Sequence, residues 1–286
     1  MRMWCGAFRF ISASVKFCLC YDAVAHRRSH MQYNPDTGGK FKIVMNTYRV
    51  FGFWETLKEI ILYLLSQKPH DDFDKKYGVV TSGVTESSDA GIADETARSL
   101  AVGYVPTREV VIRHILNNTT KGLDLNAYSF VDLGCGKGRT LIVAAQLPFK
   151  EVIGVELSPL HCDVAETNVE RYLSDGTQQL LCRNIRVCCV NAADFVFPNT
   201  NLLIYMYRPF LGPVFKHVAE NLRRFQAASG HRVLVAYSCP VEELMLEEYA
   251  GFIKRTEYQV ISMDYSWSFW ECQAEEPSEL ALTEYR

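Results

Sequence analysis

The sequence predicts an α/β fold built on a seven-stranded, mostly parallel sheet that ends in an antiparallel hairpin. Apolar stretches of strand length alternate with amphipathic stretches of helix length over the second half of the chain. This alternation is typical of parallel βαβ units with right-handed crossovers. Only Asp264 and Tyr265 separate the last two apolar stretches, and so short a connection predicts a hairpin.

The predicted elements follow from where these stretches begin and end. A first helix is expected over Thr107–Asn117, where apolar residues recur at helical spacing. Strands are then expected at 128–133, 151–156, 185–190, 201–207, 232–237, 257–263 and 266–272. The helices between them are expected at 139–147, 159–173, 213–226 and 241–249.

Composition divides the chain into four segments. Residues 1–48 lack a sustained hydrophobic period, which predicts an N-terminal extension that is disordered or belongs to a misassigned start. Residues 49–103 are expected to form a helical lid region, residues 104–273 the α/β core, and residues 274–286 a solvated acidic tail. The apolar face of 50–67 is expected to pack on the core. Its polar face is short and mixed in sign, so peripheral membrane contact is the weaker alternative.

Charge and cysteine usage exclude several classes of function. Eight of the 30 Lys and Arg residues but only two of the 33 acids lie in residues 1–49, so the remaining body is acidic. An acidic body disfavours a duplex nucleic acid held through its phosphates. The ten cysteines show no paired Cys-x2-Cys spacing, which predicts no metal site, and reduced thiols are typical of a cytoplasmic protein. No apolar stretch is long enough to span a membrane.

A glycine-rich turn follows the first predicted strand. The sequence Phe-Val-Asp-Leu-Gly-Cys-Gly-Lys-Gly-Arg covers residues 130–139, and the next predicted strand ends at Glu156. Glycines let a ligand approach the backbone where a Cβ atom would collide with it. An acid at the tip of the second strand can accept hydrogen bonds from ribose hydroxyls. Together these features predict a nucleoside-binding crevice at the carboxyl ends of the strands.

Three cofactor classes compete for this crevice. A phosphate-binding P-loop is excluded because Lys137 is followed by glycine rather than by Ser or Thr. A dinucleotide is disfavoured because Arg139 occupies the third glycine position and Asp132 would repel a pyrophosphate. The spacing Gly134-x-Gly136-x-Gly138 after Asp132 resembles the first motif of class I S-adenosylmethionine-dependent methyltransferases. The expected cofactor is therefore S-adenosyl-L-methionine.

Further segments over about residues 70–272 resemble a largely uncharacterised bacterial family of such methyltransferases. Residues 74–83 are similar to that family's entrance motif, and Tyr-Val-Pro-Thr at 104–107 looks like its Tyr-x-Pro-Thr element. Residues 203–210 resemble its Tyr-x-Tyr-Asn-Pro-Phe, and GCGKGR its glycine loop. The resemblance implies a Rossmann-like class I methyltransferase fold.

The motifs, taken residue by residue, nominate the site. The expected cofactor-binding residues are Tyr104, Thr107, Asp132, Gly134, Cys135, Gly136, Gly138, Glu156, Asn191 and Asp194. The expected acceptor-side or catalytic residues are Asp74, Tyr77, Tyr207 and Arg208. Asp74 is the plain carboxylate base among them. Tyr205 and Tyr207 alternate in one strand and should point to the same face, with Tyr207 nearer the ligand.

Arg208 departs from the family pattern, because related enzymes carry Asn or Asp at this place to hold an acceptor nitrogen. Arginine offers only donors and a permanent positive charge, so it disfavours an ammonium acceptor and suits a carboxylate or phosphate. The predicted function is methyl transfer to a small-molecule or protein acceptor. A nucleotide-cofactor oxidoreductase and a cofactor-binding protein without catalysis remain as alternatives.

Overall fold

The computed structural model describes residues 53, 72–175, 180–262 and 265–272. The predicted extension 1–48, most of the predicted helix 50–67 with its alternative of membrane contact, and the predicted acidic tail 274–286 lie outside the described residues. Residues 69–260 and 265–286 form one compact unit, and its described part holds the sheet and the helices around it.

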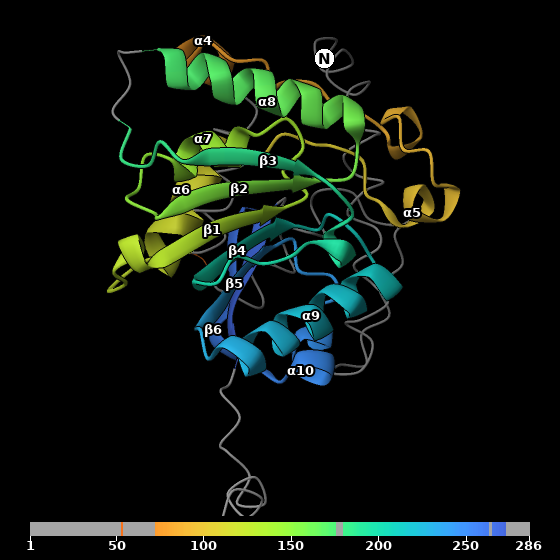
Figure 1. Cartoon of the computed structure of the whole chain (residues 1–286), viewed down its shortest axis with the longest axis vertical. Helices are drawn as coiled ribbons and strands as arrows, with labels where there is room; N and C mark the ends of the chain where they lie inside the picture. Colours follow the sequence, from red (N-terminus) through yellow and green to blue (C-terminus); the bar gives the residue numbers. More distant parts are fainter. Residues whose placement is uncertain (1–52, 54–71, 176–179, 263–264, 273–286) are drawn as a thin grey trace, which may run out of the picture. The chain divides into compact units, whose positions relative to one another are not determined.

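A seven-stranded sheet forms the centre of this unit, in the order β3-β2-β1-β4-β5-β7-β6 (Figure 1). Strands β1 to β5 pair in parallel, and β7 runs antiparallel to β5. The strands are β1 Tyr128–Leu133, β2 Glu151–Glu156, β3 Ile185–Cys189, β4 Asn201–Tyr207, β5 Val233–Ser238, β6 Phe252–Ser262 and β7 Tyr265–Cys272. This arrangement confirms the predicted mostly parallel sheet with a reversed final hairpin, the Rossmann-like fold of class I methyltransferases.

Helices cover both faces of the sheet because its central strands are apolar on both sides. One face packs against α9, whose Phe215 and Leu222 join Ile204 and Val235 in a single buried cluster. On the other face α6, α7 and α8 follow one another (Figure 1). The helices are α4 Phe73–Tyr77, α5 Glu95–Leu100, α6 Glu109–Thr119, α7 Arg139–Ala144, α8 Pro159–Ser174, α9 Pro213–Ser229 and α10 Leu244–Ala250.

Element boundaries differ from the sequence prediction where turn chemistry decides them. Helix α7 ends at Ala144 rather than at residue 147, since Pro148 disfavours helical geometry in the residue before it. Helix α10 ends on Gly251 in the left-handed conformation (φ 62°), and the chain enters β6 at once. Strand β6 therefore begins at Phe252, five residues before the predicted 257.

Candidate cofactor and acceptor site

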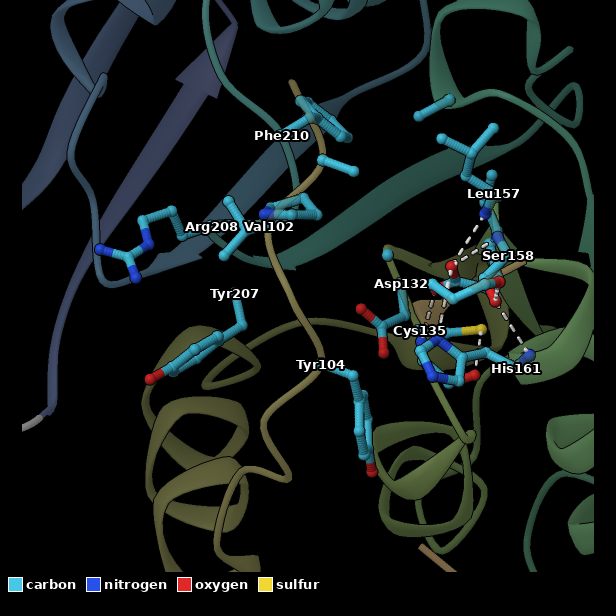
Figure 2. A pocket seen from close by; sticks show the side chains of 18 of the residues that line it. Val102, Tyr104, Asp132, Cys135, Leu157, Ser158, His161, Tyr207, Arg208 and Phe210 are labelled. Atoms are coloured by element: carbon cyan, nitrogen blue, oxygen red, sulfur yellow. Dashed lines mark hydrogen bonds and ion pairs between the residues drawn. The ribbon is translucent and has the colours of Figure 1, made fainter. Parts of the chain in front are cut away.

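A cavity enclosing about 1040 Å³, part of it open to solvent, lies at the carboxyl ends of β1, β2 and β4 (Figure 2). The strand order reverses between β1 and β4, and open α/β sheets bind ligands at such a switch point.

The glycine loop forms the floor of the cavity in a conformation that other residues rarely adopt. Gly134, Gly136 and Gly138 have φ of 86°, 53° and 82°. A Cβ atom on Gly136 would lie 2.3 Å from the Tyr104 ring, and one on Gly134 would lie 2.3 Å from Cβ of Pro209. Both glycines are therefore required because neighbouring segments pack directly onto the loop.

Glu156, at the end of β2, closes the loop against the strand. Its Oε2 accepts a hydrogen bond from Gly136 N (2.8 Å), while Oε1 accepts from Leu157 N (3.0 Å) and Ser158 N (2.8 Å). Burial raises the pKa of this carboxyl, and the three backbone bonds partly offset that rise. Each carboxylate oxygen can accept about two bonds, so Oε2 retains capacity for a hydroxyl in the cavity.

Asp132 is the second buried carboxyl and lies at the end of β1. It is 2% exposed, and burial raises its pKa to about 8; a hydrogen bond with Thr140 opposes the rise, and the charge of Glu156 adds to it. When they ionise, two buried carboxyls beside one cavity favour a cation there. This donor set fits a ligand that carries an ammonium and a sulfonium, as the predicted cofactor does.

Ten of the fourteen predicted site residues line the cavity. They are Tyr104, Thr107, Asp132, Gly134, Cys135, Gly136, Glu156, Asn191, Tyr207 and Arg208. The pKa of the Cys135 thiol is raised by burial and by the neighbouring carboxylates, which agrees with a packing role for this side chain. Asn191 also caps the following turn by accepting from Ala193 N (3.0 Å).

The other four predicted residues lie outside the cavity lining, and their contacts show why. Asp74 accepts hydrogen bonds from the Thr81 hydroxyl (2.5 Å) and from the backbone amides of Thr81 (3.0 Å) and Ser82 (2.9 Å). Burial acts to raise its pKa, but these bonds lower the pKa below its usual value. A carboxylate held in this way is a poor general base, so the predicted role of Asp74 is corrected to a structural one.

Tyr77, Gly138 and Asp194 are the remaining three. Tyr77 is 2% exposed, and its hydroxyl donates to Glu109 Oε1 (2.8 Å), so it faces α6 rather than an acceptor. Gly138 is the N-cap of α7, and a Cβ on it would press on Ala165. Asp194 belongs to a short 3-10 helix over Ala192–Asp194.

His161 also lines the cavity, although the sequence motifs did not nominate it. It is 6% exposed, its ring centroid lies 5.2 Å from that of Tyr104, and Nε2 has no hydrogen-bond partner in the structure. Burial and the charge of Lys137 lower its pKa to about 4, so the imidazole is neutral at pH 7. Its position on the first turn of α8, directly after the β2 acid, is the sequence signal that could have revealed it.

Residues before the core form a wall of the cavity. Ala90, Ile92 and Ala97 make a small apolar cluster with Leu157, and Ser158 Oγ donates to Ala90 O. At the other end of this wall, residues 101 and 210 form an antiparallel bridge. The predicted lid region, 49–103, thus contributes side chains to the cavity through its described part.

The end of β4 and the residues after it line the side of the cavity where an acceptor was predicted. Tyr205 and Tyr207 both line the cavity, as their alternation predicted. Arg208, directly after β4, has φ 39°, and Cys239, directly after the neighbouring β5, has φ 50°. Figure 2 shows Tyr207 and Arg208 pointing away from Asp132 and Cys135, whereas Tyr104 and His161 lie beside those two residues.

Comparisons with known proteins agree with the predicted activity class. Residues 126–228 match the sequence profile of a family described as "Putative methyltransferase". A protein-lysine N-methyltransferase from Saccharolobus islandicus (strain REY15A) is 39% identical over 108 residues, which are 36% of this chain and 65% of the relative. The chain thus covers slightly less than two thirds of that relative's length.

Two solved structures are similar at lower identity. An RNA methyltransferase from Salinibacter ruber in complex with S-adenosyl-L-homocysteine is 18% identical, covering 62% of this chain and 99% of that one, with a TM-score of 0.41. A ribosomal protein L11 methylase from Lactobacillus delbrueckii subsp. bulgaricus is 14% identical, covering 57% and 77%, with a TM-score of 0.40.

Among the described residues, no helix has the length and hydropathy needed to cross a membrane. The profile match covers residues 126–228. This segment holds the glycine loop, both buried carboxyls and strands β1 to β4 of the sheet. The central segment of this chain therefore combines the class I methyltransferase fold with the sequence pattern of a methyltransferase family.

Proposed function

We propose that this protein transfers a methyl group from S-adenosyl-L-methionine to a small-molecule or protein acceptor. The observation that carries the proposal is the pair of buried carboxyls, Asp132 and Glu156, on either side of a glycine loop at the switch point of the sheet. The profile match over residues 126–228 and the 39% identity to a methyltransferase support it independently.

Each part of the cavity has a role in holding the cofactor. Glu156 Oε2, which accepts one backbone bond, has capacity for a ribose hydroxyl. Asp132, at the end of β1, would pair with the ammonium of the amino-acid portion. The rings of Tyr104 and His161 would lie against the nucleoside beside the loop. Asn191 follows β3, where its amide would face the adenine.

The bound cofactor supplies an activated methyl group on a sulfonium, so the protein's task is alignment and exclusion of water. The wall formed by Ala90, Ile92 and Ala97 excludes water from the nucleoside side. Tyr207 and Arg208, which point away from Asp132, mark the side from which an acceptor would approach. Arg208 would pair with an anionic group of the acceptor.

The relative's name makes a protein lysine one specific acceptor to test. A lysine amine attacks only when it is neutral, and a neighbouring guanidinium favours the neutral form. Arg208 is thus compatible with a lysine that is deprotonated in the site, and it disfavours a permanently charged ammonium. We also propose a cytoplasmic location, supported by the seven cysteines of the described region, all of which are free thiols.

Two measurements test the proposal against its alternatives. Calorimetry should show binding of S-adenosylhomocysteine and none of NAD; the reverse result would identify an oxidoreductase. Cofactor labelled in its methyl group, incubated with the protein and with fractionated cell extract, should label either a small-molecule or a protein fraction. Binding without any label transfer would support a cofactor-binding protein without catalysis.

A further inference from the structure

The glycine loop is tied to the segment before the core by one buried guanidinium. Arg139, the first residue of α7, is 4% exposed. Its Nε donates to Thr81 Oγ1 (2.7 Å) and its Nη1 to Thr107 O (3.3 Å), while Nη2 lies 3.6 Å from Asp74 Oδ1. The guanidinium also stacks over the Phe73 ring at 4.5 Å. A side chain that excludes a dinucleotide by its size thus has a positive role in the fold.

Thr81 receives contacts from both sides and is fully buried. Its hydroxyl donates to Asp74 and accepts from Arg139, so the two charged groups meet on one oxygen. The adjacent Val80 is fixed by Asn168 of α8, which accepts from Val80 N (2.8 Å) and donates to Val80 O (3.0 Å) and Lys137 O (2.9 Å). The segment around Thr81 is therefore fastened to the glycine loop and to α8.

Tyr104 is connected to the same point. Its hydroxyl donates to Thr81 O (2.6 Å), and its ring lies so close to Gly136 that a Cβ there would be 2.3 Å away. Lys137 lies over the outer face of this ring, at 4.9 Å from the centroid, and donates to Ser82 O (2.9 Å). The ring is thus held over the glycine loop by the backbone carbonyl of Thr81.

We propose that Asp74, Thr81 and Arg139 are positioning residues that hold the Tyr104 ring against the bound cofactor. We call these three residues with Tyr104 the Thr81 latch. The inference rests on the proposed function, since the ring would touch the nucleoside in the cavity that Tyr104 lines. It assigns Asp74 a role beyond the cavity wall and predicts that the latch sets the dissociation rate of the cofactor.

Stopped-flow displacement of S-adenosylhomocysteine from the full chain tests the latch. Arg139→Met keeps length but removes every polar contact, and should speed dissociation about tenfold or more, equivalent to roughly 1.4 kcal/mol. Arg139→Lys restores one donor and should recover part of this loss. Tyr104→Phe removes one hydrogen bond and should speed dissociation roughly fivefold; Thr81→Val removes the hydroxyl bonds to Asp74 and Arg139 and should speed it at least as much. Association rates should stay within about twofold, because the latch acts on the closed complex.

The double variant Tyr104→Phe/Thr81→Val should dissociate little faster than the quicker single variant, because the two changes interrupt successive links of one chain, the Tyr104 bond to Thr81 O and the Thr81 hydroxyl bonds to Asp74 and Arg139. Arg113→Met is the matched control. The Arg113 guanidinium likewise has three polar partners, Glu109, Tyr77 and Gln146, but these lie outside the cavity lining. The control should lower thermal stability and leave the dissociation rate unchanged.

The outcomes separate the latch from the proposed function. If the wild-type chain binds no S-adenosylhomocysteine, the proposed function fails and the latch's role falls with it. If the wild type binds but Tyr104→Phe and Thr81→Val dissociate at the wild-type rate, the latch alone is overturned. Equal acceleration by Arg113→Met would assign the effect to general stability and would also overturn it. Tyr104→Phe and Thr81→Val still test the latch if Arg139→Met does not fold.

Discussion

The cofactor side and the acceptor side of the cavity differ in the kind of residue that carries a positive φ angle. On the cofactor side, all positive φ angles fall on glycines 134, 136 and 138, which adopt them without strain. On the acceptor side, a positive φ falls on Arg208, a residue for which this conformation is unfavourable, and the same holds for Cys239 after the neighbouring β5, outside the cavity lining. Strain of this kind persists only where the surrounding structure enforces it, and it clusters at functional sites. The backbone of the cofactor half is thus unstrained, whereas the backbone of the acceptor half is strained and is kept in its conformation by neighbouring residues.

The halves also differ in charge. Asp132 and Glu156 give the cofactor half two buried carboxyls, whereas Arg208 brings a guanidinium to the acceptor half. A cationic cofactor and an anionic acceptor group would be accommodated at opposite ends of one cavity. A substitution in one half should change either cofactor binding or methyl transfer alone, unless the two halves are coupled.

Removing the guanidinium of Arg208 should produce the largest difference between the effect on methylation and the effect on cofactor binding. We expect Arg208→Ala to cut methylation efficiency by about a hundredfold, which corresponds to roughly 2.7 kcal/mol, with affinity for S-adenosylhomocysteine within about twofold. Label transfer into the fraction methylated by wild type measures the first quantity, and calorimetry the second.

Two further variants show which property of Arg208 matters. Arg208→Gly relieves the backbone but also removes the guanidinium, so it should lose as much activity as Arg208→Ala. Arg208→Lys should recover part of the loss, because it keeps the charge without the forked geometry. Wild-type activity in Arg208→Ala would remove the anionic-acceptor inference.

Glu156→Ala should weaken cofactor binding. The change removes the acceptor of three backbone hydrogen bonds as well as the ribose partner. We expect affinity for S-adenosylhomocysteine to fall by roughly 1–3 kcal/mol, or about fivefold to 150-fold. Glu109→Ala is the control, since Glu109 also accepts three side-chain donors but lies outside the cavity lining. A comparable loss of affinity in the control would show that the effect is one of stability.

Asp132 should make cofactor binding depend on pH. With its pKa raised to about 8 by burial, the group is mostly protonated at pH 7 and must ionise to pair with an ammonium. Affinity for S-adenosylhomocysteine should therefore rise about tenfold from pH 6 to pH 7, more gently as pH approaches 8, and binding should release a proton. Calorimetry in buffers of different ionisation enthalpy measures that release. Asp132→Asn should bind weakly with no such dependence.

The raised pKa of Asp132 also affects the stability of the ligand-free fold. A rise in pH should lower this stability, although it increases cofactor affinity. A carboxyl whose pKa is higher in the folded state than in the unfolded chain stabilises the fold at low pH. This contribution is lost as pH rises from about 4 to about 8. Ligand-free Asp132→Asn should consequently melt several degrees above wild type at pH 8, with a smaller difference at pH 5. Equal melting temperatures at pH 8 would mean that Asp132 is ionised without cost.

The smallest effect is expected from His161. His161→Phe keeps a ring beside Tyr104 but removes Nε2, a buried polar atom without a hydrogen-bond partner among the described residues. Affinity should fall about threefold to tenfold, the worth of one hydrogen bond from a neutral group. The loss should be the same from pH 6 to pH 8, since the pKa of this imidazole is lowered to about 4. A loss that varies over this pH range would instead point to a charged His161.

The sequence by itself determined the core of this protein. Strand β1, the turn Gly134-x-Gly136-x-Gly138 and the acid Glu156 are local features, and local spacing is enough to predict a strand, a tight turn and a second strand tip. The hairpin of β6 and β7 was predicted for the same reason, although β6 begins earlier because Gly251 ends α10. Asp132 and Gly136 line the cavity as the motif predicted.

Only the tertiary structure decided what the residues outside the core do. Asp74 has the chemistry of a base, yet Thr81 and Ser82 hold its carboxylate outside the cavity lining. His161 has the pattern of a buried helix residue, yet α8 directs it toward the cavity. A side chain's type is written in the sequence, but its hydrogen-bond partners come from segments far away along the chain. Arg139 and Thr81 meet across 58 positions, a pairing that no local spacing predicts.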